Sequence, residues 1–194
     1  MTFADRLRLP LDFDPVLLRR DLDLFSEDEW IPHFVTQNYE GDWSVLPLRG
    51  PAGATHPVQS IYSDPTCDEF ADTPFLERCE YLTRVLATFR CPLHAARLMK
   101  LSAGSRILEH TDHDLEAESG VARLHIPIRT DDAVDFRLNG ERVVLRPGEC
   151  WYLRLSDPHR VENRSTADRV HLVIDVGVDR WLRALLADSA PSSE

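Results

Sequence analysis

The residues with the clearest capacity for chemistry are His110 and Asp112, which are separated by a single threonine. On an extended segment, side chains two residues apart point the same way, so this imidazole and this carboxylate can converge on one point. A third ligand is expected from a distant strand, and His159 follows Asp157-Pro158 much further along the chain. Two histidines and one carboxylate on one face of a metal are typical of non-haem Fe(II) oxygenases. The pattern therefore predicts a metal site at His110, Asp112 and His159.

Arg169 is the next candidate, because it lies shortly after His159 in the following predicted strand. A guanidinium there could bind the carboxylate of a co-substrate through two parallel hydrogen bonds. The alternative is an ordinary surface arginine, since all but one of the 22 basic residues are arginines. Position favours the first interpretation: Arg169, His171 and Val173 share one strand face, and apolar residues occupy the other. Both faces are therefore expected to be covered, as in a barrel with a lined interior.

The segments that must position these residues change character near Leu93. From there, apolar residues recur with a period of two, and turn signals such as Asn139-Gly140 separate the runs. Many short strands in series with tight turns indicate an antiparallel sandwich or barrel. A short amphipathic helix is expected to close the chain. The strands are predicted at 97–101, 124–128, 134–138, 143–145, 150–155 and 169–176, and the helix at 179–187.

The first 92 residues are expected to be helical and irregular. Asp14-Pro15 predicts a helix that ends near Asp23, and Ser26 with Glu29 has capping-box spacing. One longer helix is predicted from Pro74 to about Phe89, and edge strands and loops over 39–66. We therefore expect one domain over residues 1–187, with an N-terminal part at 1–92, a β core at 93–176, the closing helix, and a disordered tail at 188–194.

Five segments of the second half share their pattern with a known family: RLMKLSAGSRILEHTD (97–112), RLHIPI (123–128), PGECWYL (147–153), HRVEN (159–163) and RVHLVID (169–175). Together they resemble the aspartyl/asparaginyl β-hydroxylases, especially the small soluble bacterial branch that includes the proline cis-hydroxylases. The resemblance implies a mainly β fold with flanking helices around a double-stranded β-helix core, a cupin-like jelly roll. It also implies an Fe(II)-dependent dioxygenase that uses 2-oxoglutarate and O2.

The resemblance further implies roles for particular residues. Iron would lie on the triad named above, and Arg169 would bind the distal carboxylate of 2-oxoglutarate. In the animal members, the residues that match Arg123 and His125 help to bind its inner end. Those animal enzymes have glycine where this chain has Asp112. The complete triad therefore places the chain with the bacterial branch.

The implied reaction is hydroxylation of an aliphatic C–H bond in a small amino-acid-like substrate. Arg97 could bind a substrate carboxylate, and Tyr39 and Trp43 are candidates for a pocket lid. Two alternatives stay open: hydroxylation of an aspartyl or asparaginyl residue in a peptide, and a cupin-type metal or small-molecule-binding protein without 2-oxoglutarate chemistry. The cupin alternative rests on 148–163, which also resembles the second cupin motif. A catalytically silent β-helix is disfavoured by the intact triad.

The bulk properties restrict the partners. The net charge of −11 disfavours nucleic acid and anionic membranes as partners. The four cysteines form no C-x-x-C pair and the N-terminus has no long apolar run, so a reduced cytoplasmic protein is expected. Among the remaining histidines, His113 is expected in a surface loop, and His33, His56 and His94 are expected to be solvated.

Overall fold

The computed structural model describes residues 2–54, 56–61 and 67–189. The helices are α1 (Pro15–Leu22), α2 (Pro57–Ile61), α3 (Pro74–Glu77), α4 (Glu80–Leu86) and α5 (Arg180–Asp188), with short 3-10 helices at Glu27–Glu29 and Thr36–Asn38. The strands are β1 (Arg6–Asp12), β2 (Ile31–Pro32), β3 (Tyr39–Glu40), β4 (Trp43–Pro51), β5 (Phe70–Asp72), β6 (Leu93–Leu101), β7 (Arg106–His110), β8 (Val121–Arg129), β9 (Val134–Leu138), β10 (Glu141–Arg142), β11 (Glu149–Leu153), β12 (His159–Asn163) and β13 (Arg169–Gly177).

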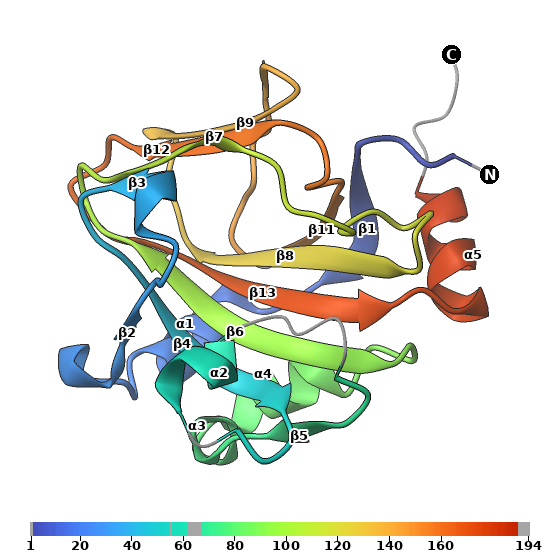
Figure 1. Ribbon diagram of the computed structural model, residues 1–194, viewed down its shortest axis with the longest axis horizontal. Coiled ribbons are helices and arrows are strands. Elements are labelled where there is room, and N and C mark those ends of the chain that lie inside the picture. Colours follow the sequence, from blue (N-terminus) through green and yellow to red (C-terminus); the bar gives the residue numbers. More distant parts are fainter. Residues whose placement is uncertain (1, 55, 62–66, 190–194) are drawn as a thin grey trace.

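The strands stack as two antiparallel sheets (Figure 1). Over the described residues, the larger sheet has eight strands in the order β1-β11-β8-β13-β6-β4-β2, with β5 paired to β4. The smaller sheet has five strands in the order β10-β9-β12-β7-β3. Strands that are neighbours in a sheet are mostly distant in sequence, as a double-stranded β-helix requires. The predicted fold class, a mainly β jelly roll with flanking helices, is confirmed.

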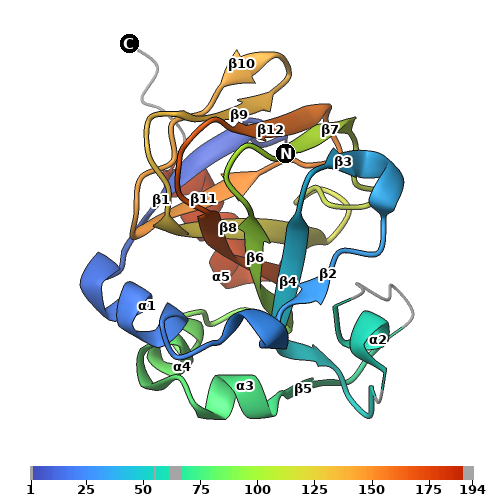
Figure 2. The same cartoon turned by 90° about the vertical axis from the view of Figure 1, so that its left-hand side faces the viewer.

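Two apolar clusters hold the layers together, and β13 contributes to both. Its even-numbered residues, such as Leu172, pack with Leu98 and Leu124 against the helices on the outer face of the larger sheet. Figure 2 shows α1, α3 and α4 on that side, with the smaller sheet on the opposite side. The inner face of β13 contributes Val173 to the second cluster, which fills the space between the sheets together with residues such as Phe136. All residues from Arg169 to Val176 are buried, as expected for a strand covered on both faces.

The N-terminal part is less helical than predicted. Residues 1–92 contain β1, which pairs with β11 at the edge of the larger sheet, and β4, which lies inside that sheet between β6 and β2. The alternation of Leu7 and Leu9, both fully or almost fully buried, was the available signal for β1. The expectation of edge strands within 39–66 is therefore wrong for β4; residues 55 and 62–66 lie outside the described part.

The predicted helix over 74–89 is interrupted. It forms as α3 and α4, and Cys79 between them has an extended backbone conformation. The cause lies elsewhere in the chain: the carboxylate of Asp21 accepts hydrogen bonds from the backbone N–H groups of Tyr81 and Leu82, at 2.7 and 2.8 Å. This buried acid caps the N-terminus of α4, so a new helix begins there.

Two smaller expectations also change. The chain returns from the Asn139-Gly140 turn as β10 at Glu141–Arg142 and not at 143–145. Both turn residues have positive φ, 53° and 77°, which explains why the partner strand starts at once. At the C-terminus, α5 begins after the capping Asp179 and includes Asp188, while 190–194 of the predicted tail lie outside the described residues.

Candidate metal centre and adjoining pockets

Two neighbouring strands of the smaller sheet position the predicted metal ligands. His110 ends β7 and is paired in register with His159, which begins β12. Asp112 lies just beyond β7, where its backbone N–H donates to the carbonyl of Leu155 at 2.8 Å. As a result, the ligand atoms of His110, Asp112 and His159 all lie within 4.8 Å of one another. The structure thus brings together the three residues that the sequence singled out.

Backbone carbonyls orient both imidazoles. His110 Nδ1 lies 2.7 Å from the carbonyl oxygen of Leu108, and His159 Nδ1 lies 3.0 Å from that of Asp157. A carbonyl oxygen only accepts, so each Nδ1 carries the proton and each Nε2 presents its lone pair. Burial also lowers the pKa of His159 to about 4, which keeps this ring neutral. Neutral, oriented imidazoles are the form that binds a metal ion.

Arg123 holds the third ligand. Its Nη1 donates to Asp112 Oδ2 at 2.8 Å, while Asp112 Oδ1 faces His110 Nε2 at 3.7 Å. The other edge of the guanidinium binds Asp175, its register partner on β13, with Nε–Oδ1 and Nη2–Oδ2 distances of 2.6 and 3.0 Å. Asp175 also forms an ion pair with Arg97. Arg97 and Arg123 thus lie at the site as members of a buried ionic network, with their charge already opposed by carboxylates.

Arg169 has a different environment. It is 3% exposed, its Nη2 lies 2.8 Å from His171 Nδ1, and its Nε has no hydrogen-bond partner among the described residues. Burial lowers its pKa to about 9, so the side chain remains a cation at neutral pH. The Nδ1 of His171 is also 3.4 Å from that of His125. The pKa of both histidines lies well below 6.5, because both are buried close to Arg169.

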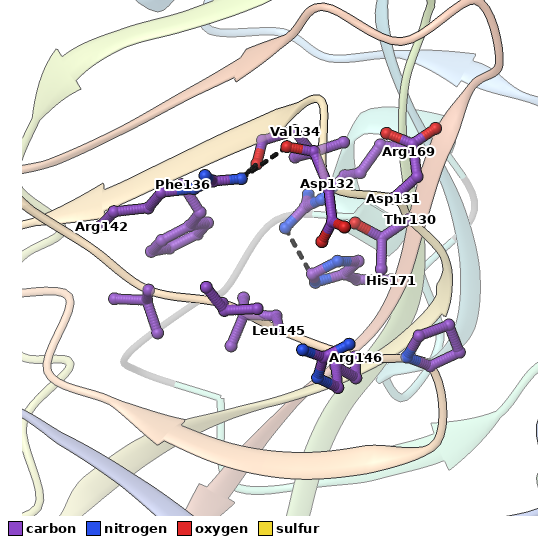
Figure 3. A pocket seen from close by; sticks show the side chains of 13 residues that line it. Thr130, Asp131, Asp132, Val134, Phe136, Arg142, Leu145, Arg146, Arg169 and His171 are labelled. Atoms are coloured by element: carbon purple, nitrogen blue, oxygen red, sulfur yellow. Dashed lines mark hydrogen bonds between the residues drawn. The ribbon is translucent and has the colours of Figure 1, made fainter.

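The metal cavity shares lining residues with a front pocket and with a rear pocket. The metal cavity is small, about 40 Å³, and is lined by the three ligand residues, Arg123, His125, Trp43, Phe136 and Arg169 among others. The front pocket, about 630 Å³, shares Asp112 and Arg123 with it. The rear pocket, about 230 Å³, shares Phe136 and Arg169 with it and is also lined by His171 and residues 142–147 (Figure 3). Asp175 in the front pocket and Arg169 in the rear pocket lie toward opposite ends of β13.

An aromatic cluster stands beside the metal cavity. Trp43 is buried and lines the cavity, while Tyr39 meets it edge-on at a ring-centroid distance of 5.7 Å. His33 stacks on Trp43 with ring centroids 3.6 Å apart and lines the front pocket. Burial lowers the pKa of His33 to about 4, so the expectation that it is solvated is wrong. Its partner Trp43 belongs to another strand, and local sequence gave no sign of the stack.

The other histidines can also be placed. His94 stacks on Phe70 with ring centroids 4.9 Å apart and is half-buried, which corrects the expectation of a solvated side chain. His113 is exposed in the loop after Asp112, as predicted, and lines the front pocket. His56 is exposed. Among the described residues, no helix has the length and apolar character needed to cross a membrane.

The fold and the site together define a double-stranded β-helix with two histidines and one carboxylate clustered between its sheets. The sequence model of the aspartyl/asparaginyl beta-hydroxylases matches residues 16–178, and the chain belongs to this family.

Two curated relatives are similar to the chain. The L-proline cis-4-hydroxylase of Rhizobium meliloti (strain 1021) is 26% identical over 165 residues, which cover 84% of this chain and 57% of that protein. The L-proline cis-3-hydroxylase 1 of a Streptomyces species is 23% identical over 176 residues, which cover 87% and 59%. The chain therefore spans less than two thirds of the length of either relative.

Solved structures are similar in fold. A 2OG-Fe(II) oxygenase family oxidoreductase from Burkholderia pseudomallei aligns with a TM-score of 0.53 and 18% identity, covering 91% of this chain and 88% of that one. A Pseudomonas putida prolyl-4-hydroxylase also gives a TM-score of 0.53, with 14% identity and coverages of 91% and 93%. At these identities the similarity establishes the shared architecture.

Proposed function

We propose that this protein is an Fe(II)- and 2-oxoglutarate-dependent dioxygenase that hydroxylates an aliphatic C–H bond of a small amino-acid-like substrate. One observation carries the proposal: the cluster of His110, Asp112 and His159 lies in the same cavity as Arg169, a buried cation without an acidic partner among the described residues. A metal site and an unpaired guanidinium in one cavity match a ligand that chelates a metal and carries a distal carboxylate.

The donor set fits iron. Two imidazole nitrogens and one carboxylate oxygen on one side of a metal leave coordination positions free for ligands that react. The side chain of Arg169 fits 2-oxoglutarate for a separate reason. A buried charge without a partner is costly, and a carboxylate would satisfy it. A cupin-type binding protein would need the metal ligands but has no use for this arginine.

In this proposal, the residues of the chain mainly bind and orient. Leu108 and Asp157 fix the two imidazole rings through their carbonyls, and Arg123 fixes one oxygen of Asp112. Iron and 2-oxoglutarate, when bound, supply the oxidation of a C–H bond to an alcohol by O2, with release of succinate and CO2. The apolar surfaces of Trp43 and Phe136 exclude water from the cavity, so that one substrate bond is directed at the metal.

The front pocket supports the choice of a small substrate. It adjoins the metal cavity at Asp112, offers the stacked ring of His33, and has room for an amino acid or a derivative of one. Both curated relatives are named as L-proline hydroxylases. Trp43 and Tyr39 are retained as candidates for substrate contact. Arg97 is a weaker candidate for binding a substrate carboxylate, because its charge is already opposed by Asp175.

Anaerobic titration with Fe(II) and 2-oxoglutarate tests the chemistry. We expect a weak charge-transfer band in the visible that is lost in His110→Ala and His159→Ala, while both variants keep the wild-type circular dichroism spectrum. Succinate release is then screened across free amino acids, carrier-bound amino acids and acidic peptides, with mass spectrometry to detect an added oxygen.

The outcomes separate the alternatives. A metal-loaded protein that gives neither the band nor succinate would refute the oxygenase and favour a cupin-type binding protein. Robust hydroxylation of an aspartyl or asparaginyl peptide, with no free or carrier-bound amino acid accepted, would refute the small-substrate assignment alone.

A further inference from the structure

The metal cavity is too small for the proposed co-substrate. It offers about 40 Å³ of space, and one water molecule needs about 10–15 Å³ of such space, so the cavity holds only a few waters. A five-carbon dicarboxylate bound at the metal must therefore extend into a neighbouring hollow. Two hollows share Arg169 with the metal cavity, and of these the rear pocket also shares Phe136 with it and is several times larger than the metal cavity.

The hydrogen bond between Arg169 and His171 determines which nitrogen of His171 carries its proton. A guanidinium N–H can only donate, so His171 Nδ1 accepts from Arg169 Nη2 at 2.8 Å. The ring is neutral because burial and the nearby cation lower its pKa well below 6.5. The single proton therefore lies on Nε2, and His171 presents an N–H group on the side of the ring away from Arg169.

That N–H group meets no acceptor among the residues that the structure describes. Neither His171 Nε2 nor Arg169 Nε has a hydrogen-bond partner in the part of the chain that the structure describes, although the two residues are only 1% and 3% exposed. Figure 3 shows the two side chains next to each other in the rear pocket, with Phe136, Leu145 and Arg146 on the surrounding walls. Two unsatisfied buried donors in one pocket require an acceptor, and a carboxylate has two oxygens to offer.

We propose that the rear pocket receives the distal carboxylate of 2-oxoglutarate, and that His171 is a binding residue that donates to it beside Arg169. The assignment rests on the proposed function and adds to it His171, which shares a strand face with Arg169. Arg169 supplies the charge. His171 fixes the orientation of the guanidinium through Nδ1 and adds a neutral donor through Nε2.

The test compares two ligands that differ only at the far end. 2-Oxoglutarate and 2-oxobutanoate share the 2-oxoacid group, but 2-oxobutanoate has no distal carboxylate. Dissociation constants of both are measured by calorimetry on the Fe(II)-loaded protein without O2. Three variants are compared with wild type: His171→Phe removes the donor, His171→Gln can both accept from Arg169 and donate into the pocket, and His56→Phe makes the same change at an exposed position.

We expect His171→Phe to raise the dissociation constant of 2-oxoglutarate roughly tenfold or more, because a hydrogen bond to a charged group contributes about that much affinity. The dissociation constant of 2-oxobutanoate should stay within about twofold of the wild-type value. His171→Gln should recover part of the loss, and His56→Phe should match wild type. An equal loss of affinity for both ligands, or no loss of affinity for 2-oxoglutarate, would overturn the role of His171. A wild-type protein that binds Fe(II) but not 2-oxoglutarate would instead overturn the proposed function, and this assignment with it.

Discussion

At the scale of single residues, Asp175 has the most demanding environment. It is 3% exposed and lies between the guanidinium groups of Arg97 and Arg123, the second of which also forms an ion pair with the candidate metal ligand Asp112. Removing the charge of one member of a buried ion pair leaves the other uncompensated. Asp175 thus helps to fix the guanidinium of Arg123, which in turn positions the candidate metal ligand Asp112.

We predict that Asp175→Asn lowers the free energy of unfolding by about 3–5 kcal/mol, because two buried cations lose the carboxylate that they share, although Arg123 keeps its ion pair with Asp112. The matched control is Asp72→Asn, which removes an exposed partner of Arg49 and should cost less than about 1 kcal/mol. Urea denaturation of both variants measures the difference. Equal, small losses would mean that other groups balance Arg97 and Arg123.

His33 gives a prediction for pH dependence. Its pKa is about 4 in the folded chain, mainly because of burial and then because of Arg97, against about 6.5 when unfolded. As pH falls from 6.5 to 4, only the unfolded chain takes up this proton, so the folded state loses stability. His33→Phe keeps an aromatic ring against Trp43 but does not titrate.

We therefore expect metal-free wild type to lose about 1–2 kcal/mol more stability than His33→Phe between pH 7 and pH 4, after allowance for partial solvent exposure. Denaturant titrations of both proteins across this range provide the measurement. A stability difference that does not change with pH would show that His33 titrates normally.

At the scale of elements, Gly148 allows the chain that follows β1 to pack closely against the start of β11. It precedes β11 with φ of +85°, and a Cβ atom there would lie 2.2 Å from the carbonyl oxygen of Phe13. The same close approach allows Phe13 N–H to donate to Gly148 O at 2.9 Å. Gly53 also has positive φ, +77°, but a Cβ atom there would meet nothing within 4 Å.

Gly53→Ala is therefore expected to cost about 1–2 kcal/mol, the strain of a left-handed alanine, and Gly148→Ala at least twice as much, because backbone must also move. Thermal or urea unfolding of the two variants makes the comparison. Equal costs would indicate that β1 and the loop after it can shift freely away from β11.

The sequence predicted helix starts and turns correctly where residues close in the chain determine them. Asp14 caps α1 with its own side chain, and the Asn139-Gly140 turn adopts the positive φ angles that these residue types favour. The break between α3 and α4 could not be predicted in this way, because Asp21 is the residue that caps α4. β1 carries an alternation of buried leucines, but its charged residues and its proline obscure that signal.

At the scale of the whole molecule, the site was partly predictable for the same reason. His110 and Asp112 are close in sequence, and alternation gave Arg169 and His171 a common face. The partners of Arg123 and the stack of His33 on Trp43 depend on which strands pair and in which register. That information is long-range, and no window of sequence contains it. The jelly roll itself was predictable because its short strands and turns each carry a local signal.

The two pockets on either side of the metal cavity bear on the order in which ligands arrive. Asp175 in the front pocket and Arg169 in the rear pocket are six residues apart on β13, about 20 Å in an extended strand. Each pocket has exposed residues at its rim, Phe34 and His113 in front and Val144 and Arg146 behind. If substrate and co-substrate enter through separate pockets, each can bind and dissociate while the other remains bound.

We predict that substrate and 2-oxoglutarate bind in either order, and that saturating substrate leaves the association rate of 2-oxoglutarate unchanged within about twofold. Val144→Trp, which narrows the rear mouth, should slow that association severalfold and spare substrate affinity. Stopped-flow absorbance without O2 measures the rates. If bound substrate prevents the association of 2-oxoglutarate, both ligands enter through the front pocket. If it does not, the proposed reaction can release succinate through the rear pocket while the hydroxylated product is still bound, and the slower of the two release steps limits turnover.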